Sequence, residues 1–186
     1  MGWIFGGIIV LIIVILIFWF IGGYNSFVRL RNKCEEAFAT MDVFLKKRYD
    51  LIPNLVETVK GYAKHESETL QKVIAARDMA ASATNAEDRI KQDNILQGTL
   101  RSLFAVTEAY PDLKANVNFM DLQGQLRSIE DDIEKSRRFY NGIVNQYNTK
   151  TETFPNNLVA SLFHFVRKPL YEVNDAAQRE NVKVEF

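Results

Sequence analysis

The chain has 186 residues, of which 23 are basic and 23 are acidic, so it carries no formal net charge at neutral pH. Without an overall basic field it has nothing to attract a nucleic-acid backbone, and we expect no nucleic-acid partner. Its length accommodates one domain with a substantial core beside a membrane segment, and its single cysteine, Cys34, excludes a disulfide within the chain.

Residues 1–23 are predicted to form a transmembrane anchor. Every residue from Trp3 to Ile21 is apolar or glycine. As a helix with a rise of ~1.5 Å per residue, this stretch spans roughly 28 Å, close to the ~30 Å of bilayer hydrocarbon. A cleaved signal peptide is the alternative, but such a peptide normally has a basic start, a shorter apolar core and an A-x-A-like cleavage site, which this stretch lacks.

The charges that follow the anchor predict its direction across the membrane. Arg29, Arg31 and Lys33 lie close behind it, whereas its N-terminal side carries only the terminal amine. Because basic residues are retained on the cytoplasmic side, we expect the N-terminus outside and the following domain in the cytoplasm. The sequence therefore predicts a single-pass protein of the cell inner (cytoplasmic) membrane, in contact with the lipid bilayer.

Residues 24–150 are predicted to form a bundle of three to four long antiparallel helices, which makes the fold all-α. The first helix follows the anchor directly and carries an apolar seam with steps of three and four residues. The seam residues are Phe27, Leu30, Cys34, Ala37, Met41 and Phe44, continued by Leu45, Tyr49, Ile52, Val56, Val59 and Ala63. Pro53 removes a backbone donor, so we expect either a kink there or a short break followed by a second helix.

Capping signals predict the next two helices. Ser67 is the expected N-cap of the first. Thr84 and Glu87 have the spacing of a capping box at the start of the second. This second helix is expected to stop at Tyr110, because Pro111 disfavours a helical residue before it.

The clearest periodicity lies between residues 119 and 147. Side chains recur there every seven residues, at Phe119, Leu126, Ile133, Tyr140 and Tyr147. Heptads of this kind suit either antiparallel packing within the bundle or a coiled coil with another chain, and the sequence leaves both open. They are the main reason for expecting a homo-oligomer.

The last part of the chain is predicted to be shorter and more polar. Within residues 151–172, a short helix is expected from Asn156 to about Phe165, either packed on the bundle or lying in the membrane interface. Residues 173–186 are expected to form a loose polar C-terminal tail.

No catalytic, cofactor-binding or metal-binding residue is predicted. His65 and His164 lie about a hundred positions apart without the spacing of a metal motif such as H-E-x-x-H. We interpret His65 as a surface residue, His164 as a packing or interfacial residue between two phenylalanines, and Cys34 on the apolar seam as core filler.

Two further absences argue against an enzyme. The acidic pairs Glu35–Glu36 and Asp131–Asp132 occupy adjacent helical positions, which point in different directions and make poor acid/base dyads. The glycines form neither G-x-G-x-x-G nor a P-loop. We therefore expect a protein that is not an enzyme and holds no cofactor.

The order of these features resembles the LemA family of bacterial membrane-anchored proteins. The matching residues, after the uncharged N-terminal span, are Tyr24, Asn25, Arg48, Leu51, Ile52, Pro53, Asn54, Leu55, Val56, Lys60, Gly61, Tyr62, Glu108, Tyr110, Pro111, Leu122, Gln123, Glu130, Ile133, Arg137, Tyr140, Tyr147, Asn148, Phe154 and Pro155. The resemblance implies a long-helix bundle with a short external N-terminus and a cytoplasmic domain. It also implies an accessory role in membrane organisation, since the family has relatives in magnetosome membranes and neighbours of membrane metalloproteases.

Three functions follow as hypotheses. The favoured one is a self-assembling helical scaffold or adaptor tethered at the cytoplasmic membrane. The second is a regulatory partner of a membrane protease, transporter or other membrane protein, in membrane stress or proteostasis. The third, an enzyme with an unrecognised site, would require a pocket in which polar groups converge.

Overall fold

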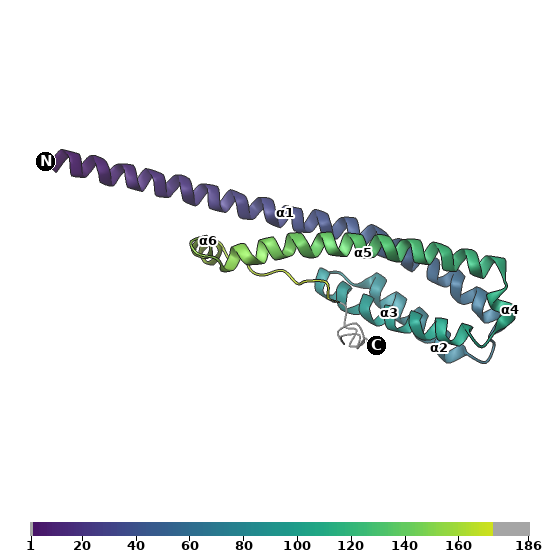
Figure 1. Cartoon of the computed structure of the whole chain (residues 1–186). Coiled ribbons are helices and arrows are strands. Elements are labelled where there is room, and N and C mark those ends of the chain that lie inside the picture. Colours follow the sequence, from purple (N-terminus) through teal and green to yellow (C-terminus); the bar gives the residue numbers. More distant parts are fainter. Residues whose placement is uncertain (1, 173–186) are drawn as a thin grey trace, which may run out of the picture. The chain divides into compact units, whose positions relative to one another are not determined.

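The computed structural model describes residues 2–172, and every regular element in this part of the chain is a helix (Figure 1). In chain order the helices are α1 (Gly2–Tyr62), α2 (Ser67–Ser82), α3 (Ala86–Thr107), α4 (Pro111–Lys114), α5 (Val117–Glu152) and α6 (Asn156–Leu162). The predicted all-α class with one long apolar N-terminal helix is confirmed. The number of helices in a bundle and their antiparallel direction stay predictions, and the expected polar tail, 173–186, lies outside the described residues.

The chain divides into two compact units. Among the described residues, unit 1 comprises residues 2–40 together with Ser136–Leu170, and unit 2 comprises Met41–Lys135 with Tyr171 and Glu172. Helices α2, α3 and α4 belong to unit 2, and α6 belongs to unit 1. The long helices α1 and α5 each contribute to both units.

The N-terminal part of α1 fits a membrane anchor. Among the described helices, α1 is the one that is long and apolar enough to cross a membrane, and none of its apolar window is buried inside the structure. Residues 3–19 are all exposed. An exposed apolar helix of this length has its natural surroundings in bilayer hydrocarbon.

Beyond the anchor, the predicted seam of α1 becomes its buried face. Ten of the twelve seam residues are buried, and only Leu30 and Phe44 are partly exposed. The steps of three and four residues place these side chains on one side of the helix, so burying that side removes a continuous apolar stripe from water.

The break expected at Pro53 does not occur, because α1 continues through this residue to Tyr62. A proline in a helix leaves the carbonyl four residues earlier without its usual N–H donor, and that carbonyl belongs to Tyr49. Here Arg77 of α2 replaces the missing donor, since its Nε lies 3.1 Å from the Tyr49 oxygen. A side chain from the neighbouring helix thus satisfies the backbone that Pro53 leaves open.

The predicted starts of α2 and α3 are each wrong by one residue. Ser67 is the first helical residue of α2, and the N-cap is Glu66, without a side-chain cap. In α3 the N-cap is Asn85, whose Oδ1 accepts a 2.8 Å hydrogen bond from the Asp88 amide. Asparagine caps a helix as well as threonine does, so Asn85 with Asp88 replaces the expected box of Thr84 with Glu87.

The predicted end of α3 is also wrong, because α3 ends at Thr107 rather than at Tyr110. The amides of Ala109 and Tyr110 bond to carbonyls three residues earlier, at 3.0 and 3.1 Å. The chain therefore tightens into a turn before Pro111, which starts α4.

All five side chains of the predicted heptad series on α5 are buried in the single chain. At the positions three residues after the first four of them, Leu122, Ile129 and Ile143 are partly exposed, and Ser136 is buried. The seven-residue series therefore serves the interior of this chain, and any association with another copy has to use side chains that remain exposed.

The helix expected from Asn156 to about Phe165 is shorter, since α6 ends at Leu162. His164 adopts a left-handed φ of 56°. The amide of Phe165 then bonds to the Ala160 carbonyl at 2.9 Å, and the amide of His164 approaches the Ser161 carbonyl at 3.4 Å. This arrangement is a Schellman motif, which closes the helix and turns the chain away from it.

Candidate functional site

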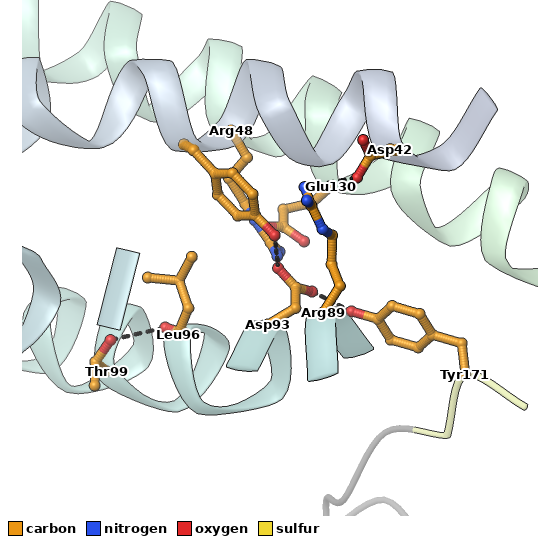
Figure 2. A network of polar contacts seen from close by, with 9 residues as sticks. Asp42, Arg48, Arg89, Asp93, Leu96, Thr99, Glu130 and Tyr171 are labelled. Atoms are coloured by element: carbon orange, nitrogen blue, oxygen red, sulfur yellow. Dashed lines mark hydrogen bonds and ion pairs between the residues drawn. The ribbon is translucent and has the colours of Figure 1, made fainter. Parts of the chain in front are cut away.

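A connected group of polar side chains lies in the interior of unit 2. It joins Arg48 and Tyr49 of α1, Asp93 of α3, Glu130 of α5 and Tyr171 from the segment after α6 (Figure 2). We call these five residues the Arg48 cluster. Arg48 and Asp93 are each only 1% exposed, so the cluster contains a fully buried ion pair.

Local sequence positions each member of the cluster. Arg48 and Tyr49 follow Leu45 by three and four residues, and these two steps place them on the buried face of α1. Asp93 lies three residues after Ile90 and three before Leu96, both buried on α3. The charged residues Arg48 and Asp93 therefore each occupy a core position, one on α1 and the other on α3.

The hydrogen bonds of the cluster converge on the Asp93 carboxylate. Its Oδ1 accepts from the Arg48 Nη2 and, at 3.1 Å, from the Tyr49 hydroxyl. Its Oδ2 accepts from the Tyr171 hydroxyl. The other terminal nitrogen of Arg48 donates to Glu130 Oε1 at 2.8 Å. One carboxylate is thus held by three donors from two different parts of the chain.

Three members of the cluster, Arg48, Tyr49 and Tyr171, keep their usual ionic forms near neutral pH. Burial alone would lower the pKa of Arg48, but the charges of Asp93 and Glu130 outweigh it and raise that pKa. Burial, and after it the nearby Asp93 charge, raise the pKa of both Tyr49 and Tyr171. Both phenols therefore stay protonated and act as hydrogen-bond donors.

This arrangement suits a structural lock better than proton transfer. A general acid or base requires a pKa near the working pH, whereas the shifts in this cluster move Arg48, Tyr49 and Tyr171 further from it. The cluster instead ties α1 and the segment at Tyr171 to the Asp93 carboxylate of α3, and Arg48 ties α1 to Glu130 of α5 as well. Beside it, Arg89 pairs with Asp42 at 2.8 Å and adds a second link between α3 and α1 (Figure 2).

The segment after α6 is held by side chains along its length. In unit 1, Asn148 of α5 bonds both backbone groups of Lys168, donating to its carbonyl and accepting from its amide at 2.9 Å each. The Tyr140 hydroxyl donates to the Pro169 carbonyl at 2.8 Å. In unit 2, Asn94 of α3 donates to the Glu172 carbonyl at 2.9 Å. Helix side chains therefore supply the bonds that a neighbouring strand would give in a sheet.

The residues weighed from sequence as possible catalytic or metal-binding groups lie outside the cluster. Cys34 is buried, and burial raises the pKa of its thiol, which disfavours the reactive thiolate. His65 is exposed in the turn after α1, and His164 forms the left-handed turn after α6. Across residues 3–172, no three His, Cys, Asp or Glu side chains gather in a way that could hold a metal ion.

The acidic pairs on the helices likewise do not form dyads. Glu35 receives a 3.4 Å contact from Lys168, and both Glu35 and Glu36 are exposed. Asp132 approaches Lys135 at 3.7 Å, and Asp131 is exposed. Each is a surface charge of its helix.

Sequence reasoning did not find the Arg48 cluster. Arg48 and Glu130 carried the family resemblance without a role, and Asp93 and Tyr171 were not singled out. A usable signal was present: Arg48 and Asp93 are charged residues at positions where the helical period calls for an apolar one. Buried charges are retained only when they are paired, so two such interruptions of opposite sign predict a partnership.

Comparison with known proteins decides the family. Residues 37–186 match the LemA family, which is most of the chain and includes all five residues of the Arg48 cluster. The chain belongs to the LemA family. The resemblance drawn from the sequence is thereby confirmed, and the match begins beyond the anchor, in the part that forms the buried seam.

Two kinds of relative are similar to this LemA-family chain. Protein LemA of Metamycoplasma hominis is 28% identical over 170 residues, which cover 89% of this chain and 76% of the relative. Magnetosome proteins MamQ 1 and MamQ 2 of Paramagnetospirillum magneticum are each 23% identical over 179 aligned residues, covering 82% of this chain and 66% of theirs. None of these three names describes an enzymatic activity.

Proposed function

We propose that the protein is a membrane-anchored helical scaffold or adaptor at the cytoplasmic membrane, which assembles with copies of itself and does not act as an enzyme. One observation carries the proposal: α1 supplies both the exposed apolar span and the buried seam of the following domain without a break in the helix. The domain core and the anchor are therefore parts of one element, so the folded domain stays at the membrane.

Exposed apolar side chains outside the span support self-assembly. They lie on several helices and are Val43, Met79, Ile95, Val117, Met120 and Phe139. Apolar groups of this size favour contact with a protein surface over water. Phe139 is the most exposed aromatic ring on α5, at 60%, and is the first candidate for such a contact.

The stoichiometry of the full chain in lipid nanodiscs tests self-assembly. We expect particles that contain several copies, measured by single-particle mass at concentrations from nanomolar to micromolar. Phe139→Ser removes the exposed ring, whereas Gln146→Ser, one heptad later on the same helix, is the matched control. A particle of one copy throughout this range contradicts the scaffold. A different membrane protein present in equal amount would favour the regulatory role with a protease or transporter instead.

The proposed orientation has its own test. A cysteine added after Phe186, in a Cys34→Ala background, is treated with a membrane-impermeant thiol reagent on intact and on permeabilised cells. The basic residues Arg29, Arg31 and Lys33 support a cytoplasmic domain, so labelling is expected only after permeabilisation. Equal labelling of intact cells would place the domain outside.

A further inference from the structure

Helix α6 lies against the end of the apolar run of α1. Val159 of α6 covers Gly23, and a Cβ at residue 23 would come within 3.3 Å of the Val159 Cγ2. The ring of Phe163, directly after α6, has its centroid 4.6 Å from that of Tyr24 and 5.8 Å from that of Phe20. Packing contacts therefore fix α6 at the level of residues 20–24 of α1.

Residues 20–24 of α1 lie at the edge of the bilayer if the proposed membrane anchoring holds, and the inference rests on that proposal. The apolar run of α1 ends at Ile21. Gly23 follows only two residues later, a helix rise of about 3 Å. Trp19 and Tyr24, on either side of this point, are the residue types that favour the headgroup level. α6 is thus docked where α1 leaves the hydrocarbon.

The exposed side of α6 carries two large apolar side chains beside the small Ser161. Leu158 and Leu162 lie one helical turn apart and are 54% and 61% exposed. Phe154 before the helix and Val166 after it are 79% and 72% exposed. Four large apolar side chains around one short helix are unfavourable in water, whereas the boundary between headgroups and acyl chains would remove them from it.

Basic side chains of the same unit lie within about two helical turns of Gly23 along α1. Lys150 donates to the Ser26 hydroxyl and stands 5.1 Å from the centroid of the Phe27 ring. Arg31 lies 5.9 Å from the centroid of Phe165. Both are within reach of the level at which lipid phosphates lie, and cations near that level favour a membrane with anionic lipids.

We propose that α6 is a second membrane-contacting element, which lies in the interface beside α1 and inserts Leu158 and Leu162 among the lipids. The occupant of the exposed face is the lipid surface itself. A free helix as short as α6 would bind a membrane surface only weakly. Here its contacts with Gly23, Tyr24 and Phe20 of α1 hold it at the interface. The chain thereby touches the membrane at two places, across it and along its surface.

Depth-dependent fluorescence quenching tests this proposal on the full chain. Trp3→Phe and Trp19→Phe remove both natural tryptophans, and Leu162→Trp then provides a single probe on the exposed face. Phe139→Trp on α5 is the matched control, since its native side chain has almost the same exposure, 60% against 61%. Each chain is reconstituted in vesicles of phosphatidylcholine and phosphatidylglycerol whose acyl chains carry bromine at shallow or deep positions.

We expect shallow bromines to quench the Leu162→Trp chain at least threefold more strongly than the Phe139→Trp chain. Equal weak quenching of both would overturn the interfacial placement. Emission shifted to the blue without bromine quenching would mean that a second copy covers the face, which also overturns it. Flotation of the unsubstituted chain with the vesicles separates the two proposals, because a chain that does not float refutes the anchor itself.

Discussion

At the scale of single residues, the buried pair of Arg48 and Asp93 makes the largest demand on the fold. Removing two charges from water is costly, and the cost is offset only when each charge finds good partners. Asp93 finds three donors, and Arg48 finds a second carboxylate in Glu130. Loss of one partner should therefore be far more damaging than loss of a surface ion pair.

Asp93→Asn is expected to lower the free energy of unfolding by about 3–5 kcal/mol, because it leaves the buried Arg48 with only one carboxylate. Thermal or denaturant unfolding of the full chain in mild detergent measures the change. The control is Asp50→Asn, which removes an exposed pair with Lys46 on α1 and should cost no more than about 0.5 kcal/mol. Arg48→Met combined with Asp93→Leu should recover part of the loss. A loss as small as that of Asp50→Asn would show that the pair does not stabilise the fold.

Tyr140 predicts how stability changes at alkaline pH. Burial raises the pKa of its phenol from an ordinary value of 10.0 to about 12, so the folded chain keeps a proton that the unfolded chain releases. The free energy of unfolding should therefore fall as pH rises from 10 to 12. Tyr140→Phe loses the hydrogen bond to Pro169, about 1 kcal/mol at pH 8, but should show a shallower fall in this window. Parallel curves for the two chains would contradict the shift.

At the scale of the elements, α1 remains one helix because a neighbour compensates for its proline. The Tyr49 carbonyl loses its intrahelical donor at Pro53 and accepts from Arg77 of α2 instead. This contact joins two helices at a point where an isolated helix would be weakest. It predicts an energetic coupling between residues 53 and 77, which have no direct hydrogen bond to each other.

A double-mutant cycle measures that coupling. Arg77→Met should destabilise the chain by about 2 kcal/mol, since it removes a charged donor from a partly buried carbonyl. In a Pro53→Ala background the backbone N–H returns and satisfies Tyr49, so the same change should cost about 1 kcal/mol less. Lys72→Met on the solvent side of α2 is the control. Equal costs of Arg77→Met in both backgrounds would contradict the compensation.

The turn after α6 gives a second prediction at this scale. His164 holds a left-handed backbone conformation, which is costly for any residue with a side chain and most costly for a β-branched one. His164→Gly should therefore raise stability by up to about 1 kcal/mol, and His164→Val should lower it. The midpoints of thermal unfolding of the two variants, compared with that of the unsubstituted chain, measure both effects. The reverse order would mean that contacts of the imidazole, and not the backbone, decide the stability of this turn.

How much of the structure could be predicted from the sequence depends on how far apart in the chain the interacting residues lie. The apolar span, the seam of α1 and the heptads of α5 were predictable, because helical periodicity is written into neighbouring residues. Helix starts were displaced by one residue where Asn85 competed with Thr84 as a cap. The contacts of Asp93 with Arg48 and Tyr171 were missed, since they join residues 45 and 78 positions apart. The charges at core positions of α1 and α3 indicate that Arg48 and Asp93 need partners of opposite sign, but no local pattern points to Tyr171.

At the scale of the whole molecule, α1 carries both the exposed apolar run that fits a membrane anchor and the buried seam of the core, and the match to the LemA family covers the core. The proposed scaffold and the proposed interfacial role of α6 depend on different parts. The first requires exposed side chains such as Phe139, and the second requires the face with Leu158 and Leu162. Variants on one surface should therefore leave the other property unchanged.

Gly23 makes one consequence of this architecture concrete. Gly23 has no side chain between its backbone and Val159. A methyl group at this position would therefore force the Val159 side chain to move by a few tenths of an ångström. A bulkier side chain would push α6 away from α1 and leave it connected to the rest of the chain at the end of α5. The absence of a side chain at Gly23 would then decide how deeply α6, more than a hundred residues later, lies in the membrane interface.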